Sequence, residues 1–195
     1  MTMMQMIKYT NIILILYFVF SVLQCRNGSL SRENLPGGDF SLTDQDGKIF
    51  QLSSLKGKTV FLYFGYTYCP DACPMTLAKL NAVYGKLQDR RDQLRIVFVS
   101  VDPKRDTPKR LKEYLEYYKD LSPIGLTGKE EEIQKVVKLF AGSYKKSDSV
   151  KSEEYYLVDH STYTYLIDSG GITRYLFKHD DSVDTIANLV KVFLK

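Results

Sequence analysis

Four segments of the chain place apolar side chains at positions i, i+3, i+4 and i+7, the spacing that lines one face of an α-helix. Each segment is therefore predicted to form an amphipathic helix that packs on a core. Thr107 and Pro108 suit the N-cap and the first turn of the second helix, and Gly142 suits the C-terminal end of the third. The apolar positions are Leu80/Val83/Tyr84/Leu87, Leu111/Tyr114/Leu115/Tyr118, Ile133/Val136/Val137/Phe140 and Ile186/Leu189/Val190/Phe193.

Apolar runs outside these helices predict the strands of a sheet. Residues 60–64 are apolar throughout, which is typical of a buried strand. Turn residues at Asp46-Gly47 and at Ser169-Gly170-Gly171 join pairs of short strands, so a hairpin is expected near each end of the domain. The predicted strands cover residues 40–43, 48–52, 60–64, 94–101, 124–126, 162–167 and 172–177.

The order of these elements predicts the fold. A hairpin is followed by a strand, a helix, a strand and two helices separated by a short strand, and the chain ends with a strand hairpin and a helix. A βαβ unit followed by a ββα unit is a thioredoxin-like arrangement. We therefore expect an α/β, thioredoxin-like fold over residues 39–195, with an N-terminal β-hairpin and an inserted middle helix.

The first 25 residues predict export and a membrane tether. Residues 12–23 are apolar apart from Ser21, a length that suits the hydrophobic region of a signal peptide better than a full span of about 20 residues. Residues 22–25 resemble the lipobox of bacterial lipoproteins, in which the cysteine, here Cys25, is lipidated after cleavage. Gln24 departs from the small residue usual there. Lipidation at Cys25 and an uncleaved signal anchor both stay open, and either would hold the domain at a membrane, facing the periplasm or another extracytoplasmic side.

Composition favours one folded domain behind a linker. Residues 26–38 contain Gly, Ser, Asn and Pro and are predicted to form that linker. The 195-residue chain is 44% hydrophobic and 26% charged, which is enough for one domain with a real core. Its 27 basic and 23 acidic residues are well mixed, so the net charge of +4 gives little reason to expect a nucleic-acid partner.

Cys69 and Cys73 are the first candidates for chemistry. They lie directly after the buried strand at residues 60–64 and directly before a helix. Pro74 suits the first position of that helix, because its missing N–H would be unpaired there, so both thiols are expected in the turn. The partial positive charge of a helix N-terminus favours the thiolate, which binds metals and attacks disulfides. In an oxidising compartment the pair is expected to cycle between dithiol, disulfide and metal-bound forms.

His160 is the expected third partner of the two thiols. It precedes the strand at residues 162–167, which in a thioredoxin-like sheet lies beside the strand that leads to the cysteines. The cis-proline that thioredoxins place at this point is absent, since the last proline is Pro123. Two thiolates and one imidazole suit copper, because soft sulfur favours Cu(I) and imidazole serves either oxidation state. Structural zinc usually takes four protein ligands, so zinc fits this set less well.

Four segments together resemble the signatures of the Sco/SenC family, whose members are membrane-tethered, thioredoxin-like copper chaperones associated with assembly of the CuA centre of cytochrome c oxidase. The resemblance implies that Cys69, Cys73 and His160 bind one copper ion, Cu(I) or Cu(II), and that the cysteines form a disulfide when copper is absent under oxidising conditions. It also implies as partners the copper-bearing subunit of cytochrome c oxidase and other periplasmic copper carriers. The segments are residues 64–74, 100–108, 125–128 and 158–161.

Neighbouring residues are candidates for supporting roles. Asp71 and Asp159 lie next to the expected ligands, so their carboxylates are candidates to orient a ligand or to meet a basic surface of a partner. The alternative is that Asp71 shapes the turn and Asp159 caps a loop. The polar residues 145–154 are predicted to form a mobile loop that moves His160 onto or off the metal.

Two functions stay open on the sequence alone. The first is a copper metallochaperone, a carrier rather than an enzyme. The second is a thiol–disulfide oxidoreductase that reduces the cysteines of the acceptor. His160 separates them, because reduction needs no imidazole ligand. A peroxiredoxin-like peroxidase is not favoured, because Leu62 and Tyr66 occupy the Pro and Thr positions that its active-site pocket requires.

Overall fold

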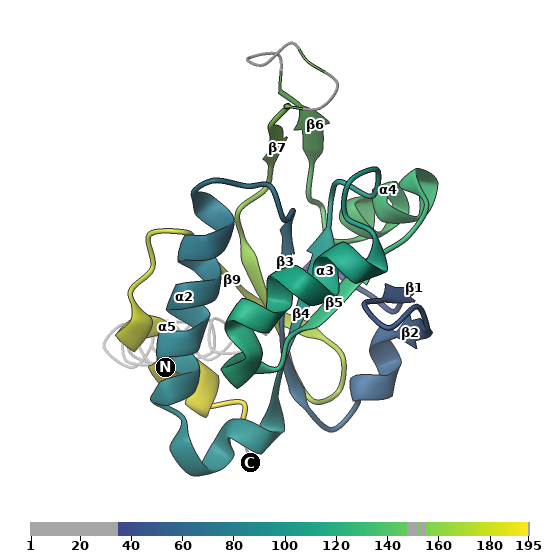
Figure 1. Cartoon of the computed structure of the whole chain (residues 1–195). Coiled ribbons are helices and arrows are strands. Elements are labelled where there is room, and N and C mark those ends of the chain that lie inside the picture. The colour runs from purple at the N-terminus through teal and green to yellow at the C-terminus, as the bar shows by residue number, and fades with distance from the viewer. Residues whose placement is uncertain (1–34, 148–151, 153–154, 195) are drawn as a thin grey trace, which may run out of the picture. The chain divides into compact units, whose positions relative to one another are not determined.

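The computed structural model describes residues 35–147, 152 and 155–194 (Figure 1). The predicted signal or anchor segment, Cys25 and most of the predicted linker lie outside the described residues. Among the residues that are described, no helix has both the length and the apolar character needed to cross a membrane.

Within this described part, seven strands form the central sheet (Figure 1). The strands are β1 (Ser41–Asp44), β2 (Ile49–Gln51), β3 (Thr59–Gly65), β4 (Leu94–Ser100), β5 (Ile124–Thr127), β8 (Thr164–Ile167) and β9 (Thr173–Phe177). Their order across the sheet is β2-β1-β5-β4-β3-β8-β9. The strands β3, β4 and β5 run parallel, whereas β8 is antiparallel to β3, and β1 is antiparallel both to β5 and to β2.

Four α-helices in the described part cover this sheet. They are α2 (Ala72–Gly85), α3 (Pro108–Leu115), α4 (Glu130–Leu139) and α5 (Val183–Lys191), with short 3-10 helices η2 (Leu52–Leu55), η3 (Gln88–Gln93) and η4 (Glu116–Leu121). The helices α2 and α5 lie side by side (Figure 1). Phe61 of β3 packs in the same cluster as Leu80 of α2 and Ile186 of α5. Phe64 contacts Phe140, just after α4. Every residue of β3 is buried, because helices cover both faces of the strand.

The start of α2 differs from the prediction. The helix begins at Ala72, with Asp71 as its N-cap, so Cys73 lies within the first turn and Pro74 is the third helical residue. The expectation that Pro74 opens the helix and that both thiols precede it was wrong. The first four N–H groups of a helix have no partner within the helix, so proline is tolerated at the third position as well as at the first.

Two predicted helix ends also shift. The segment through Tyr118 leaves the α-helix at Leu115 and continues as η4, where Tyr118 adopts a non-helical φ of −118°. At the end of α4, Ala141 takes the left-handed conformation that the sequence assigned to Gly142, with a φ of 51°. The N–H groups of Ala141 and Gly142 donate to the carbonyls of Lys138 and Val137, both at 2.9 Å, which is a Schellman motif.

Two short strands were not predicted. The strands β6 (Tyr144–Lys146) and β7 (Val158–His160) pair antiparallel in a separate sheet, with Tyr144 opposite His160. Figure 1 shows this pair extending from the end of the domain where β3 runs into α2. His160 therefore lies in a strand rather than in the loop before β8. The predicted mobile loop begins within β6, and residues 148–151 and 153–154 of it lie outside the described residues.

Candidate metal centre

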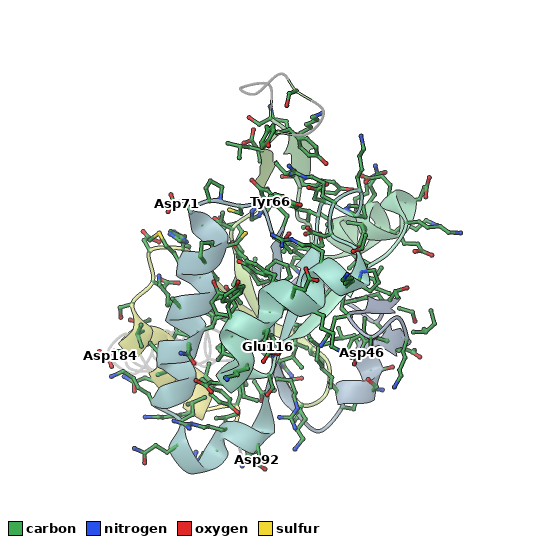
Figure 2. All side chains as sticks on the ribbon, in the orientation of Figure 1. Asp46, Tyr66, Asp71, Asp92, Glu116 and Asp184 are labelled. Atoms are coloured by element: carbon green, nitrogen blue, oxygen red, sulfur yellow. The ribbon has the colours of Figure 1, made fainter. Side chains whose placement is uncertain are left out.

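The expected site lies where β3 ends and the chain enters α2. Figure 2 labels Tyr66 and Asp71 at this end of the domain, and Cys69 lies between these two residues in the chain. Cys69 is half-buried, whereas Cys73, in the first turn of α2, is fully buried. The carboxyl ends of parallel strands are where α/β folds place ligands, because the connecting loops converge there.

The structure brings together the three residues that the sequence singled out. The Sγ atoms of Cys69 and Cys73 and a ring nitrogen of His160 all lie within 4.8 Å of one another. The Nε2 atom of His160 is 3.7 Å from the Sγ atom of Cys73. Three separate parts of the fold supply these atoms: the loop after β3, the first turn of α2, and β7.

The imidazole of His160 is oriented by a backbone carbonyl. Its Nδ1 atom lies 3.0 Å from the carbonyl oxygen of Ser161. A carbonyl only accepts, so the proton belongs on Nδ1 in this hydrogen bond, and the Nε2 lone pair is left facing the thiols. The rings of Tyr63 and Tyr66 pack edge-to-face against the imidazole, with centroids at 6.1 Å and 5.8 Å. This arrangement is typical of a histidine prepared to bind a metal through Nε2.

The two thiols have opposite electrostatic environments. The hydrogen bond from the Cys73 side chain lowers the pKa of Cys69, and further hydrogen bonds from the backbone N–H groups of Asp71 and Cys73 add to this effect. The hydrogen bond to Cys69, together with burial, raises the pKa of Cys73. Cys69 is therefore the thiolate of the metal-free pair, and Cys73 keeps its proton.

Two residues around Cys73 were missed by the sequence reasoning. A Cβ atom placed on Gly65 would lie 2.9 Å from Cys73 Sγ and 2.8 Å from a ring carbon of Phe98, so only glycine leaves room for the thiol. The hydroxyl of Tyr63 donates to Cys73 Sγ at 3.9 Å. A glycine that closes an apolar strand signals close approach by another group, and that signal was present in the sequence.

The two carboxylates proposed as supports do not touch the donor atoms. Asp71 and Asp159 are exposed, and no hydrogen bond joins either carboxylate to Cys69, Cys73 or His160 among the described residues. Asp71 acts instead through its backbone N–H, which helps to lower the pKa of Cys69. A role for these carboxylates in meeting a basic partner stays a prediction.

The donor set fits copper. Two sulfur atoms and one imidazole nitrogen are soft or borderline ligands, which Cu(I) favours and Cu(II) accepts. Within the described residues no fourth His, Cys, Asp or Glu side chain joins the group, whereas structural zinc usually has four protein ligands. Cys69 is only half-buried whereas Cys73 is buried, so Cys69 is the more exposed of the two cysteines.

Comparison with known proteins places the chain in a family. The family model described as SCO1/SenC matches residues 29–195. The chain belongs to the SCO1/SenC family. It is 41% identical over 155 residues to an "SCO2-like protein" of Rickettsia felis, an alignment that covers 80% of this chain and 75% of that relative. The Sco/SenC resemblance of the four sequence segments is therefore confirmed.

Solved structures of Sco proteins share the fold. Bradyrhizobium japonicum ScoI with copper bound superposes with a TM-score of 0.73 at 37% identity, covering 82% of this chain and 99% of that one. BsSco, described as having a disulfide switch and as a member of the Sco family of cytochrome c oxidase assembly proteins, has a TM-score of 0.62 at 30% identity, covering 82% and 94%. The predicted α/β, thioredoxin-like fold is confirmed.

Proposed function

We propose that this protein is a copper metallochaperone that holds one copper ion through Cys69, Cys73 and His160 and delivers it to the CuA site of cytochrome c oxidase. The observation that carries the proposal is the convergence of these three donors within 4.8 Å. The copper bound in Bradyrhizobium ScoI and the description of BsSco as a cytochrome c oxidase assembly protein support the metal and the acceptor.

The arrangement suits a carrier. The Cys69 thiolate offers the first bond to an incoming ion. The proton of Cys73 leaves as the second sulfur binds, because a thiol must deprotonate to become a ligand. The Nε2 lone pair of His160 is already free to complete the set. A set of only three donors, one of them on the partly exposed Cys69, lets an acceptor thiolate join the ion before a donor leaves, so the ion passes by ligand exchange.

The N-terminal segment is proposed to tether this domain. Residues 1–25 would act as a signal peptide or membrane anchor, with Cys25 as the lipidation candidate, and residues 26–38 would link it to a domain on the periplasmic or extracytoplasmic side. Mass spectrometry of the mature protein tests this. A lipid-modified Cys25 as the first residue supports the lipoprotein route, an intact N-terminus in the membrane fraction supports a signal anchor, and a soluble unmodified chain contradicts both.

Metal analysis and spectroscopy of the purified protein test the copper proposal. We expect one equivalent of copper per chain and thiolate-to-copper charge-transfer absorption when Cu(II) is bound. Metal-free protein that fails to retain added copper through dialysis would contradict it.

The alternative function is a thiol–disulfide oxidoreductase. The lowered pKa of Cys69 and the raised pKa of Cys73 support it, because disulfide exchange begins with one thiolate and ends with attack by the second thiol. The Cys69 thiolate would attack the acceptor disulfide to form a mixed disulfide and release one acceptor thiolate. Cys73, on losing its proton, would then attack Cys69, releasing the second thiolate and leaving the Cys69–Cys73 disulfide. Stoichiometric reduction of an acceptor disulfide by copper-free protein, with no retained copper, would favour this function.

A further inference from the structure

Asp106 is a fully buried carboxylate in the connection between β4 and α3. Three hydrogen bonds satisfy it: Oδ2 accepts from the Ser100 hydroxyl at 2.6 Å and from the Thr67 N–H at 2.9 Å, and Oδ1 accepts from the Thr67 hydroxyl at 2.7 Å. Burying a carboxylate is costly unless hydrogen bonds compensate. These groups are therefore held in one arrangement by the need to satisfy the carboxylate.

Two of these three bonds go to Thr67, which lies just before Cys69 in the loop between β3 and α2. Thr67 is 6% exposed, and its hydroxyl also accepts from the Nε atom of Arg110 at 3.2 Å. The N–H and the hydroxyl of Thr67 thus bond to Asp106, just before α3, and the hydroxyl also bonds to Arg110 within α3. Thr67 and Asp106 are 39 positions apart in the chain. These hydrogen bonds therefore fix the thiol loop against a separate part of the domain.

Tyr66, the residue before Thr67, contacts the strand that carries His160. The Tyr66 hydroxyl accepts from the N–H of Val158 at 3.2 Å, and Val158 opens the strand β7 that carries His160. The N–H of Cys69 donates to the Tyr66 carbonyl at 3.2 Å. Tyr66 therefore contacts both the His160 strand and the Cys69 turn, and Thr67 fixes this junction to Asp106.

We propose that Asp106 is a positioning residue: through Thr67 it sets the placement of Cys69 relative to Cys73 and His160. This inference rests on the proposed copper function. Asp106 is not itself a ligand, because its carboxylate is buried and its oxygens already accept three hydrogen bonds. Groups that hold ligands in place without touching the metal commonly change affinity about tenfold to a hundredfold when they are removed.

The chain offers matched variants that separate positioning from simple stability. Thr67→Val removes the hydroxyl between Asp106 and Arg110 at nearly constant shape, whereas Thr67→Ser keeps it. Asp106→Asn keeps the shape but replaces one acceptor with a donor. Val190→Ala trims a fully buried side chain of α5 and serves as a destabilised control.

Three measurements on the purified protein give the test: copper affinity by competition, the thiolate-to-copper charge-transfer band, and, without copper, the equilibrium constant for Cys69–Cys73 disulfide formation against glutathione. We expect Thr67→Val and Asp106→Asn to weaken copper binding at least about tenfold and to shift the band. We expect the disulfide constant to fall at least about threefold, because the two thiols are held together less often. Thr67→Ser should recover most of each property, and Val190→Ala should lower the melting temperature only.

Other outcomes decide against the proposal. A folded Thr67→Val protein with the wild-type affinity, band and disulfide constant would overturn it, as would Val190→Ala reproducing the same changes. If Asp106→Asn does not fold, the Thr67→Val and Thr67→Ser pair still decides. If the wild-type protein retains no copper, the proposed function fails, but the disulfide constants of the copper-free variants still decide whether Asp106 positions the thiol loop.

Discussion

The Nε2 atom of His160 lies 3.7 Å from the Sγ atom of Cys73, although 87 positions separate the two residues in the chain. The contact joins β7, which carries His160, to the first turn of α2, which carries Cys73, and the Ser161 carbonyl orients the imidazole so that Nε2 faces the thiol. A histidine in this position adds a nitrogen donor to the two thiols. Metal binding uses this donor, whereas disulfide exchange does not need it.

Replacing His160 with alanine should therefore weaken copper binding at least about tenfold, because one of three donors is lost, and should leave disulfide exchange largely intact. Copper competition titrations and exchange with a model disulfide measure the two properties. The second histidine gives a matched control, since His179 lies outside the donor cluster and His179→Ala should keep the copper affinity. Unchanged copper affinity in His160→Ala would rule out the chaperone proposal.

Gly65→Ala should destabilise the fold and disturb the site together. The new Cβ atom would meet Cys73 Sγ at 2.9 Å and a Phe98 ring carbon at 2.8 Å, and overpacking of this kind costs about 1–3 kcal/mol. The same change at Gly85, where the new Cβ would meet nothing within 4 Å apart from its own helix backbone, should stabilise the protein by about 0.5 kcal/mol. Denaturant unfolding of both variants checks the opposite signs, and equal effects would contradict the packing argument.

Alkylation of the copper-free dithiol should be selective and nearly independent of pH. Only the thiolate attacks iodoacetamide, and the pKa of Cys69 is lowered, so its rate should stay flat between about pH 6 and about pH 8. At pH values below its pKa, an unperturbed thiol would instead react about ten times faster for each unit by which the pH rises. Cys73 should react slowly because its pKa is raised and its side chain is buried. Mass spectrometry of each cysteine gives the rates.

The Cys73→Ala variant tests the cause of this selectivity. The hydrogen bond from Cys73 is the largest contribution that lowers the pKa of Cys69, so its removal should raise that pKa and restore a rise of rate with pH. A flat profile in the variant would assign the effect to the other hydrogen bonds.

Breaking the ion pair between Asp102 and Arg105 should cost much of the stability. The two side chains are only 3% and 12% exposed, and Arg105 also stacks on the ring of Tyr156 at 3.6 Å. Asp102→Asn leaves a guanidinium largely buried without its counter-charge, at a cost of about 3 kcal/mol. Asp46→Asn breaks an exposed pair with Lys112 and should change little. Thermal unfolding compares the two, and a similar loss in both would contradict the role of burial.

Much of the fold was predictable because the relevant signals are local. The spacing of Leu80 and Val83, or of Ile133 and Val136, records which face of each helix is buried, and both pairs are buried in the structure. The strands β6 and β7 were missed because each has only three residues, and their pairing depends on a partner far along the chain. No local pattern distinguishes such strands from a loop.

The features of the candidate site likewise separate into those that the sequence carries and those that tertiary packing sets. The sequence by itself determined the thiol pair at a helix start, His160 as the histidine to join it, and the resemblance to Sco proteins, because residue types and spacing carry that information. Only the tertiary structure decided that the Ser161 carbonyl rather than Asp159 orients the imidazole, that Cys69 rather than Cys73 is the thiolate, and that Asp106 holds Thr67. Each of these depends on distances between atoms from separate segments, which packing sets and sequence spacing does not.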